Sequence, residues 1–362
     1  MSERRIVVVG AGIIGASIAY HLAQRGGQVT VLEEREPAIA ATGSSFAWIN
    51  ASFKQPRTYF DLNCAGMRGW RRLQSEIGGA QLVIQWGGAV RWEDQEKKVA
   101  WHRDAVVRQQ VWGCNTRVVA EEEIRELLPN VDPGRVLIGC YCDEDGALDA
   151  NAATSVLLNA AKGDGAEVIY PCAVTGFDIA AGRIRGVVAG ERRFGADTVV
   201  LAAGVGVPKL AGMLTTKVPL IDSAGILVHG WHAARVLDKV AIAPRTQLTQ
   251  LPSGKFVISA NAAAGHRIGT DVAAGATLVA EAVRYLGALD RSAIADTTVG
   301  WRVMPEDGFP VVGPVGITGT YAAAMHSGIT LAPVVGQLVA IEILEGVEVE
   351  ALRPYRPSRF QP

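Results

Sequence analysis

Apolar and polar residues occur in alternating blocks at the start of the chain, and these blocks predict strands and helices in turn. Four β-branched residues, Ile6 to Val9, are typical of a strand that is buried on both faces. A helical stretch, Ile13 to Arg25, follows and ends at Gly26-Gly27. A second apolar run, Val29 to Leu32, indicates another buried strand. The order of strand, helix and strand predicts an α/β fold.

The middle of the chain has the pattern of shorter strands joined by tight turns. Residues 165–194 contain apolar runs separated by Ala181-Gly182 and Gly190-Glu191, which predict two hairpin turns. Residues 195–210 contain a further strand that closes on the small residues Ala202-Ala203-Gly204. Small residues at a strand end allow either the close approach of a cofactor or tight packing beneath a neighbouring helix.

Near the C-terminus, a strand over Tyr321 to Ala324 precedes a predicted helix from about Leu331 to Glu345. Pro333 in the first turn and Gly346 just past the end are typical signals of helix boundaries. The apolar stretch 328–344 contains a proline and two polar residues, so it predicts a buried helix rather than a membrane span.

Composition narrows the class of protein. The 362 residues are 49% hydrophobic, which predicts a large core and two domains. The 35 basic and 36 acidic side chains nearly cancel, so nucleic acid is not an expected partner. Five cysteines without a C-x-x-C pair indicate neither a disulfide framework nor a zinc site, and no metal is expected. The N-terminus lacks the small-residue cleavage pattern of a signal peptide, so the sequence predicts a cytoplasmic protein.

A glycine pattern, Gly10-x-Gly12-x-x-Gly15, joins the first strand to the first helix. Gly10 permits the tight turn, Gly12 lets the backbone approach a pyrophosphate, and Gly15 lets helix and strand pack closely. The pyrophosphate would lie at the helix N-terminus, where free N–H groups and the dipole favour anions. Glu33, at the end of the second strand, would bind the adenosine ribose and repel the 2′-phosphate of NADP. The pattern predicts a dinucleotide site and leaves FAD and NAD open.

Two later features favour a flavin. Residues 41–53, ATGSSFAWINASF, offer hydroxyls and backbone N–H groups that suit phosphate or the flavin edge, although composition alone also fits a surface loop. The helix near Leu331 would direct its positive N-terminus beyond Gly328 to Thr330. Reduced flavin carries negative charge around its pyrimidine carbonyl, which such a helix end stabilises. A nicotinamide has no such need.

The chain resembles the D-amino-acid-oxidase-type FAD-dependent oxidoreductases, a family that includes glycine oxidase, sarcosine oxidase and D-amino-acid dehydrogenases. The similar stretches follow the family's order from residue 4 to about residue 340. They are VVVGAGIIGASIAYHLAQRG, VTVLEE, ATGSS, DEDGALDANAATSVLLNAA, VVLAAGVGVPKL, GWRVMPEDGFPVVGP and HSGITLAP. Taken together these stretches are specific to the family, although each alone is not.

The resemblance implies two domains. A Rossmann-type FAD-binding domain is expected from residues 1–45, 140–220 and 300–362. A discontinuous α+β substrate-binding domain, with an antiparallel sheet and helices, is expected from residues 46–139 and 221–299. Within the second domain, the charged stretch 92–110 predicts a solvated helix.

The resemblance also implies non-covalent FAD. Ser44-Ser45-Phe46 has no neighbouring histidine and Met325-His326 has no neighbouring cysteine, and these are the places where covalent members of the family attach the ring. The residues expected to contact FAD are Gly10, Gly12, Ile13, Ile14, Gly15, Glu33, Glu34, Thr42, Gly43, Ser44, Ser45, Ala47, Trp48, Val174, Ala203, Gly204, Gly328, Ile329, Thr330 and Leu331.

Arg302 stands six residues before Gly308 in a P-x-D-G-x-P-V context, and the resemblance implies that it binds the substrate carboxylate above the flavin. A guanidinium matches a carboxylate with two parallel hydrogen bonds. The alternative is a loop charge, or a salt bridge to Glu306 or Asp307. His326 is expected near the ring as a second catalytic residue, or else as a structural histidine.

Further residues complete the predicted pocket. Asn50 and Trp48 are expected to reach the substrate, with Phe53 and Trp301 as additional walls and Arg245 as a further lining residue. Core packing is the alternative for the aromatic side chains.

These patterns lead to the hypothesis of an FAD-dependent amino-acid or amine oxidase or dehydrogenase. The family's chemistry implies oxidation of a C–N bond in a small amino acid or N-substituted amine by hydride transfer to flavin N5. Reoxidation by dioxygen or by a quinone or another electron-transfer acceptor is left open. The alternatives are an NAD-dependent dehydrogenase and a flavoprotein subunit that needs a partner chain, so a homo- or hetero-oligomer is compatible with the sequence.

Overall fold

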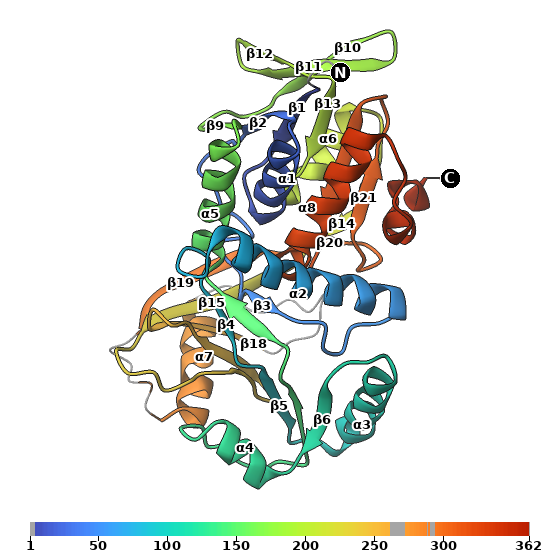
Figure 1. The fold of residues 1–362 in the computed structure, drawn as a ribbon. Helices are drawn as coiled ribbons and strands as arrows, with labels where there is room; N and C mark the ends of the chain where they lie inside the picture. The colour runs from blue at the N-terminus through green and yellow to red at the C-terminus, as the bar shows by residue number, and fades with distance from the viewer. Residues whose placement is uncertain (1–3, 261–271, 288, 290–293, 362) are drawn as a thin grey trace.

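A computed structural model describes residues 4–260, 272–287, 289 and 294–361 of the chain. Figure 1 shows a mainly parallel sheet with helices in the upper part and a larger sheet in the lower part. The long helix α2 (Arg57–Ile77) crosses between the two parts. The fold is α/β, as the order of apolar blocks predicted.

Strand β1 lies at the centre of the mainly parallel sheet. In the described part of the chain the strand order is β21-β22-β13-β1-β2-β9, and β21 is the antiparallel member. The bounds are β1 Arg5–Val9, β2 Gln28–Leu32, β9 Glu167–Ile169, β13 Thr198–Leu201, β21 Val311–Pro314 and β22 Thr320–Ala324. The two buried strands predicted at the start of the chain are confirmed as β1 and β2.

Alternate residues of β1 enter different cores. Ile6 and Val8 pack with the helices α1 (Ile13–Gln24), α5 (Ala150–Gly163) and α8 (Gly328–Glu345). Val7 and Val9 pack on the other face, with α6 (Val207–Met213) and a three-stranded meander. The meander consists of β10 Gly176–Ala180, β11 Arg183–Ala189 and β12 Arg192–Gly195, and its two turns lie where the sequence predicted them. The strand is apolar throughout because both of its faces are covered.

Helix α8 begins at Gly328, earlier than the predicted start near Leu331. Pro333 therefore lies inside the helix rather than in its first turn, where a proline cannot donate the backbone hydrogen bond to Ile329. The indole Nε1 of Trp70, on α2, donates to the Ile329 carbonyl oxygen instead, at 2.7 Å. This replacement partner explains how the helix extends through the proline.

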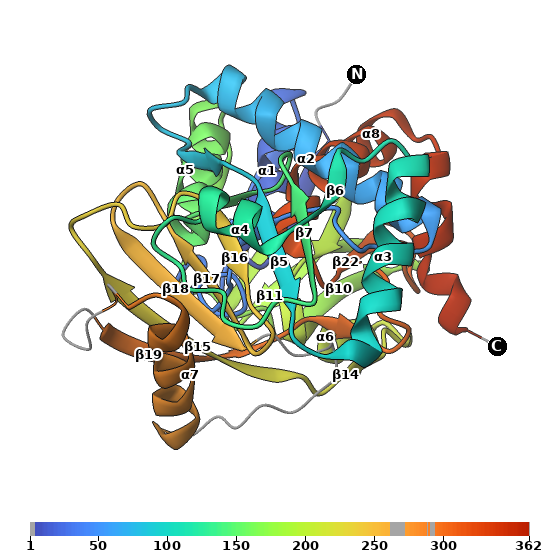
Figure 2. The same cartoon turned by 90° about the horizontal axis from the view of Figure 1, so that it is seen from below.

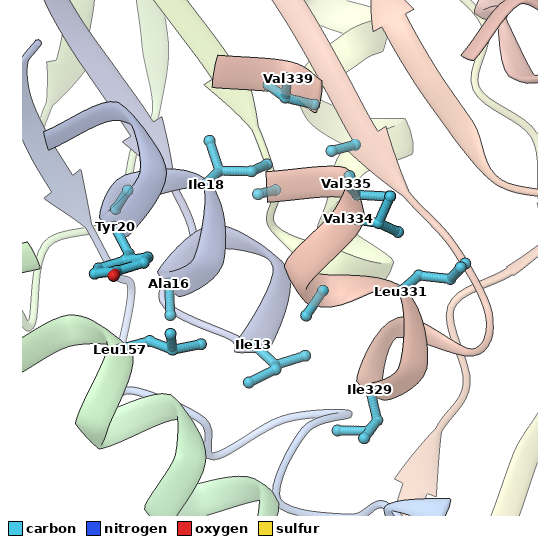
Figure 3. Close-up of a cluster of buried hydrophobic side chains, with 14 of the residues drawn as sticks. Ile13, Ala16, Ile18, Tyr20, Leu157, Ile329, Leu331, Val334, Val335 and Val339 are labelled. Atoms are coloured by element: carbon cyan, nitrogen blue, oxygen red, sulfur yellow. The ribbon is translucent and has the colours of Figure 1, made fainter. Parts of the chain in front are cut away.

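The same helix is long and apolar enough to cross a membrane, but most of it is buried inside the fold. Figure 3 shows Ile13 and Ile18 of α1 in one buried cluster with Val335 of α8. A Cβ at Gly336 would overlap the Ser17 hydroxyl of α1, and that hydroxyl donates to the Ala332 carbonyl oxygen at 2.6 Å. Helix α8 is therefore a core helix, as its interrupted apolar pattern predicted.

The larger sheet has the strand order β19-β15-β18-β17-β16-β5-β7-β6 among the described residues. Its pairs are antiparallel, as predicted for the substrate-binding part, except that β16 runs parallel to β5. In Figure 2, seen from below, the helices α3, α4 and α7 lie around this sheet. The bounds are β5 Ala89–Glu93, β6 Thr116–Val119, β7 Ile138–Cys142, β15 Ala224–Trp231, β16 Val240–Ile242, β17 Thr246–Gln250, β18 Lys255–Ala260, β19 Ile294–Trp301, α3 Glu96–Val111, α4 Glu121–Leu127 and α7 Val272–Tyr285.

The predicted solvated helix over 92–110 needs two corrections. Trp92 and Glu93 belong to β5, where both are buried, and the helix α3 begins only at Glu96. One side of α3 is also buried, including Ala105 and Val106, because it packs on the strands of the larger sheet. The charges of this stretch therefore cover only the outer side of the helix.

Shorter elements complete the fold. The sheet β3-β8-β4 joins Trp48–Ile49, Gly146–Leu148 and Ile84–Trp86, and β14 (Leu220–Ile221) pairs with β20 (Met304–Pro305). The 3-10 helices are η1 Gly204–Gly206, η3 Glu350–Tyr355 and η4 Pro357–Phe360. Strand β7 spans the predicted domain boundary at residue 140, and α2 packs on α8. The division into segments 1–45, 140–220 and 300–362 against the remainder therefore stays a prediction.

Candidate functional site

The glycine pattern lies where β1 turns into α1. Gly10 has a φ of 106°, and a Cβ there would lie 2.6 Å from the Ala202 carbonyl oxygen at the end of β13. A Cβ on Gly15 would overlap the Gly10 carbonyl oxygen. Gly12 is the N-cap residue and has no side chain to cap the first turn. The three glycines thus leave the amino terminus of α1 open to an anion.

Two side chains from outside α1 frame this amino terminus. The half-buried Glu33 accepts hydrogen bonds from the backbone N–H of Ala11 at 2.9 Å and of Arg35 at 3.0 Å, through different oxygens. Each carboxylate oxygen has a second lone pair, which suits the hydroxyls of a ribose. Thr42 is buried, and its hydroxyl accepts from the Ile13 N–H at 3.1 Å. Glu33 and Thr42 therefore converge on the glycine turn, while their contacts with FAD stay predictions.

Other predicted cofactor contacts lie along the same sheet edge. A Cβ on Gly204, just beyond β13, would be 3.4 Å from Val303. A Cβ on Gly300 would lie 2.6 Å from that of Ser44, so the loop holding the predicted Thr42 to Ser45 segment meets β19. Val174 is half-buried in the loop that follows β9, whereas Glu34 is exposed. Contacts of these residues with FAD stay predictions.

The amino terminus of α8 faces the segment that carries Trp48 and Asn50. Ser327, its N-cap residue, is in the left-handed region at a φ of 58° and makes no side-chain cap. The Thr330 hydroxyl accepts from the Asn50 N–H at 3.2 Å and donates to the Trp48 carbonyl oxygen at 3.3 Å. Three of the predicted residues are thus brought together at the first turn of α8.

The amino termini of α1 and α8 meet at this site. A Cβ on Gly328 would be 3.5 Å from a side-chain carbon of Ile14, so the first turn of α8 lies on that of α1. Neither helix has a side-chain cap on its N-cap residue. Two helix amino termini side by side, neither capped by its own N-cap side chain, suit a cofactor with a pyrophosphate and a ring that becomes negative on reduction. The residues present therefore fit FAD.

The indole of Trp48 is held by a buried carboxyl group that the sequence analysis did not single out. Trp48 Nε1 donates to Asp145 at 3.1 Å, and the Ser52 hydroxyl donates to the same oxygen at 2.9 Å. Asp145 is fully buried, and burial raises its pKa well above the usual range. The guanidinium of Arg91 lies 5.8 Å from the Trp48 ring centre and lines the same small cavity. The DEDGALD stretch, noted only as a resemblance, was the signal that could have identified Asp145.

Arg302 lies just after β19, opposite the start of β15. Its backbone N–H donates to the Ser223 carbonyl oxygen at 2.8 Å, and its Nη1 donates to that of Ala224 at 2.9 Å. The guanidinium covers Gly225, where a Cβ would lie 2.5 Å from Nη2. Burial lowers the pKa of Arg302, and no carboxylate pairs with it among the described residues.

The predicted alternative partners of Arg302 lie elsewhere. Asp307 forms an ion pair with Arg359 at 2.6 Å, and Glu306 is exposed. The salt-bridge alternative for Arg302 is therefore wrong in the described part of the chain. The guanidinium keeps donors for a ligand instead.

His326 follows β22 and lies among cations. Burial lowers its pKa to about 3, and the nearby positive charges of Lys54 and Arg302 act in the same direction. Lys54 Nζ donates to the Ser327 hydroxyl at 2.8 Å, and the Tyr59 hydroxyl donates to the same oxygen at 3.1 Å. The sequence analysis missed Lys54, although it is the one charged residue between positions 41 and 56.

Among the remaining predicted pocket residues, Phe53 lines the small cavity that also contains Trp48 and Arg91, whereas Trp301 and Arg245 do not line it. Trp301 is 50% exposed, and Phe53 stacks on Trp101 with ring centres 5.6 Å apart. Arg245 pairs with Asp94 and Glu281, each at 3.4 Å. Arg245 is thus part of a charge cluster on the larger sheet, and its predicted lining role is not supported.

Comparisons with known proteins identify the family of the chain. A family model described as FAD dependent oxidoreductase matches residues 5–341. Glycine oxidase of Bacillus licheniformis is 25% identical over 98% of this chain and 96% of its own length. An opine oxidase subunit of Agrobacterium tumefaciens is 25% identical over 99% of this chain and 98% of its own length.

Solved structures give the same fold. A glycine oxidase from Bacillus cereus has a TM-score of 0.88 at 22% identity, with 98% of each chain covered. The family match decides between the two cofactors that the glycine pattern left open, since it is a match to FAD enzymes and not to nicotinamide enzymes. The chain therefore belongs to the D-amino-acid-oxidase family of FAD-dependent oxidoreductases.

Proposed function

We propose that this enzyme oxidises the C–N bond of an amino acid or N-substituted amino acid whose carboxylate binds Arg302. The observation that carries the proposal is a half-buried guanidinium with no acidic partner among the described residues. Burying an unpaired charge is unfavourable, and a substrate carboxylate would balance it. Similarity to glycine oxidase over nearly the whole chain supports an amino-acid substrate.

Bound FAD supplies the two-electron acceptor for this oxidation. The protein's own contribution is to bind and orient the substrate. The Ala224 carbonyl oxygen and the open space over Gly225 hold the Arg302 guanidinium in place. Two parallel hydrogen bonds from it would fix the carboxylate and hence the adjacent carbon. His326, with its pKa lowered to about 3, is neutral at physiological pH and adds no further positive charge next to the substrate amine.

The test compares two substitutions of Arg302 on two substrates. Arg302→Ala should lower kcat/KM for sarcosine by about 2–5 kcal/mol in transition-state free energy, because the carboxylate loses its partner. Arg302→Lys should also be impaired, because an ammonium group cannot form the paired hydrogen bonds. Dimethylamine differs from sarcosine in lacking the carboxylate, so its much weaker oxidation should barely change.

Arg185→Lys, on the exposed face of β11, is the matched control and should behave like the wild type. FAD content and thermal stability should also be unchanged in the Arg302 variants. Equal losses for sarcosine and dimethylamine, or unfolding of both Arg302 variants, would show that Arg302 is structural and would contradict the amino-acid proposal.

Similarity to a chain that is itself one subunit of an opine oxidase supports a second candidate, in which this chain works as part of a hetero-oligomer. The purified chain alone should then bind FAD but fail to transfer electrons from any amino acid. Anaerobic bleaching of the flavin absorbance by an amino acid, with no other protein present, would exclude this candidate.

A further inference from the structure

Lys54 lies in the loop between β3 and α2 and reaches the amino terminus of α8. Its Nζ donates to the hydroxyl of the N-cap residue Ser327 at 2.8 Å and lies 5.6 Å from the centre of the Tyr59 ring. The side chain is half-buried, and no carboxylate pairs with it in the described ranges of the chain. A hydroxyl gives an ammonium group a hydrogen bond but no opposite charge.

Other half-buried lysines of this protein have acidic partners. Lys255 pairs with Asp149 at 2.9 Å, and Lys98 pairs with Glu93 at 3.0 Å. Lys54 departs from this pattern. Its position is therefore not explained by the charge pairing that holds comparable lysines in the fold.

Lys54 and Arg302 approach the same histidine from different elements. His326 lies two residues after β22, and a Cβ on Gly204, three residues after β13, would be 3.4 Å from Val303, the neighbour of Arg302. β13 and β22 are parallel neighbours, so their carboxyl ends lie together at one edge of the sheet. The Ser327 hydroxyl that accepts from Lys54 also lies 3.4 Å from His326 Nδ1, so Lys54 is one contact away from the histidine.

A buried hydroxyl adds a donor on the Arg302 side. Ser223 faces Arg302 across the β15–β19 pairing, and its side chain is 2% exposed. Its hydroxyl has no hydrogen-bond partner among the described residues. The site thus presents two cations, an uncapped helix end and an unpaired hydroxyl, with no described acid in contact with either cation.

One carboxylate would balance only one of these two cations. We propose that the natural substrate carries two carboxylates, and that Lys54 binds the second while Arg302 binds the first. This inference rests on the proposed function and narrows its substrate class to dicarboxylic amino acids or N-carboxyalkyl amino acids. Ser327 and Tyr59 are the positioning residues. Ser327 accepts a hydrogen bond from the Lys54 ammonium and Tyr59 donates to Ser327, so the two residues hold the ammonium at the amino terminus of α8.

The test uses two inert ligands that differ by one carboxylate. Diglycolate and methoxyacetate both have an ether oxygen where the substrate has nitrogen, so neither has a C–N bond to oxidise. Calorimetric titration of the FAD-loaded protein at fixed ionic strength should show diglycolate binding about tenfold to hundredfold more tightly, the value of one charge-assisted hydrogen bond. Lys54→Met should remove this preference and leave methoxyacetate binding unchanged within about twofold of the wild type.

Two further variants keep the result interpretable. Lys97→Met, at an exposed position of α3, makes the same change in net charge and should keep the preference for diglycolate. Lys54→Gln retains a hydrogen-bond donor for Ser327, so it replaces Lys54→Met if that variant is unstable, and it should also lose the preference.

Equal binding of the two ligands by the wild type would overturn the inference. So would a Lys54 variant that weakens both ligands by the same factor, because Lys54 would then serve the flavin or the fold. Arg302→Met should weaken both ligands. If it does so while Lys54 variants have no selective effect, only the second carboxylate site fails. If binding of neither ligand depends on Arg302, the proposed function fails and this inference fails with it.

Discussion

Two helix amino termini meet at the candidate site, and the side chains around them carry opposite charges. At α1, the carboxylate of Glu33 accepts the Ala11 N–H. At α8, the ammonium of Lys54 donates to the N-cap Ser327, and the positive charge of Arg302 lowers the pKa of the neighbouring His326. Both helix ends attract anions through their backbone N–H groups. The opposite charges of the two ends therefore come from their side chains.

This difference in charge indicates that the two helix ends bind different ligands. A phosphate at α1 would be balanced by backbone N–H groups, and the carboxylate of Glu33 would select for ribose hydroxyls rather than for further negative charge. At α8, side-chain cations would accept whatever acidic groups the substrate brings. The backbone geometry at α1 thus suits FAD, and the side chains at α8 suit the substrate.

The largest expected effect concerns the backbone geometry at α1. Gly15→Ala places a Cβ against the Gly10 carbonyl oxygen, so strand and helix must separate. We expect a loss of about 3 kcal/mol in the free energy of unfolding, at the upper end for an overpacked site, together with loss of bound FAD. Urea unfolding and the flavin absorbance of the purified protein measure both.

Gly163→Ala is the matched control for this substitution, since a Cβ at that position of α5 meets nothing within 4 Å. It should retain FAD and be at least as stable as the wild type, because alanine favours a helix over glycine. If Gly15→Ala were equally harmless, close packing of the backbone would not be what shapes the α1 site.

The two helix ends also differ in how well the sequence predicted them. Most of the α1 site is contained in residues 4–34, where strand, glycines, helix and acidic residue follow one another, and the structure confirmed that order. The α8 site joins distant parts of the chain: Lys54 and Ser327 are 273 positions apart, and Trp48 and Asp145 are 97 apart. Spacing within one sequence does not encode such pairs, so Lys54 and Asp145 were missed.

Helix boundaries show the same limit. The predicted start of α8 near Leu331 followed from Pro333, because a proline normally occupies a first turn. The structure starts the helix at Gly328, since Trp70 of a distant helix bonds to the carbonyl group that the proline leaves without a donor. Arg302 was identified through the family resemblance, whereas its lack of an acidic partner became visible only in the structure.

A smaller effect is expected at Glu33, the acidic side chain beside α1. Glu33→Ala should weaken FAD binding about tenfold to hundredfold, because charge-assisted hydrogen bonds contribute about 1.5–3 kcal/mol. Equilibrium titration of the FAD-free protein with FAD measures the change. Glu36→Ala, at an exposed position outside the predicted FAD contacts, should have a much smaller effect. Equal effects of the two substitutions would mean that net charge, rather than a contact with ribose, explains the loss.

The smallest effect concerns His326, which lies near the cations at the α8 end, and it depends on pH. The pKa of His326 is lowered to about 3 in the folded protein by burial and by the charges of Lys54 and Arg302. In the unfolded chain a histidine has a pKa of about 6.5, so the unfolded state takes up the proton first as the pH falls. The stability that this residue contributes is therefore fully present above about pH 6.5 and is lost as the pH falls from there towards about 3.

His326→Gln removes this titration and should sharpen the contrast between the two helix ends. Between about pH 7.5 and about pH 5.5 the wild type should lose about 1.4 kcal/mol more free energy of unfolding than the variant, because one pH unit below the unfolded pKa corresponds to that amount. Urea unfolding of both proteins at the two pH values gives the difference, and constant packing effects of the substitution cancel. If His326→Gln loses as much stability as the wild type over this range, the imidazole is not held neutral. The α8 end would then lack the cationic surroundings that distinguish it from α1.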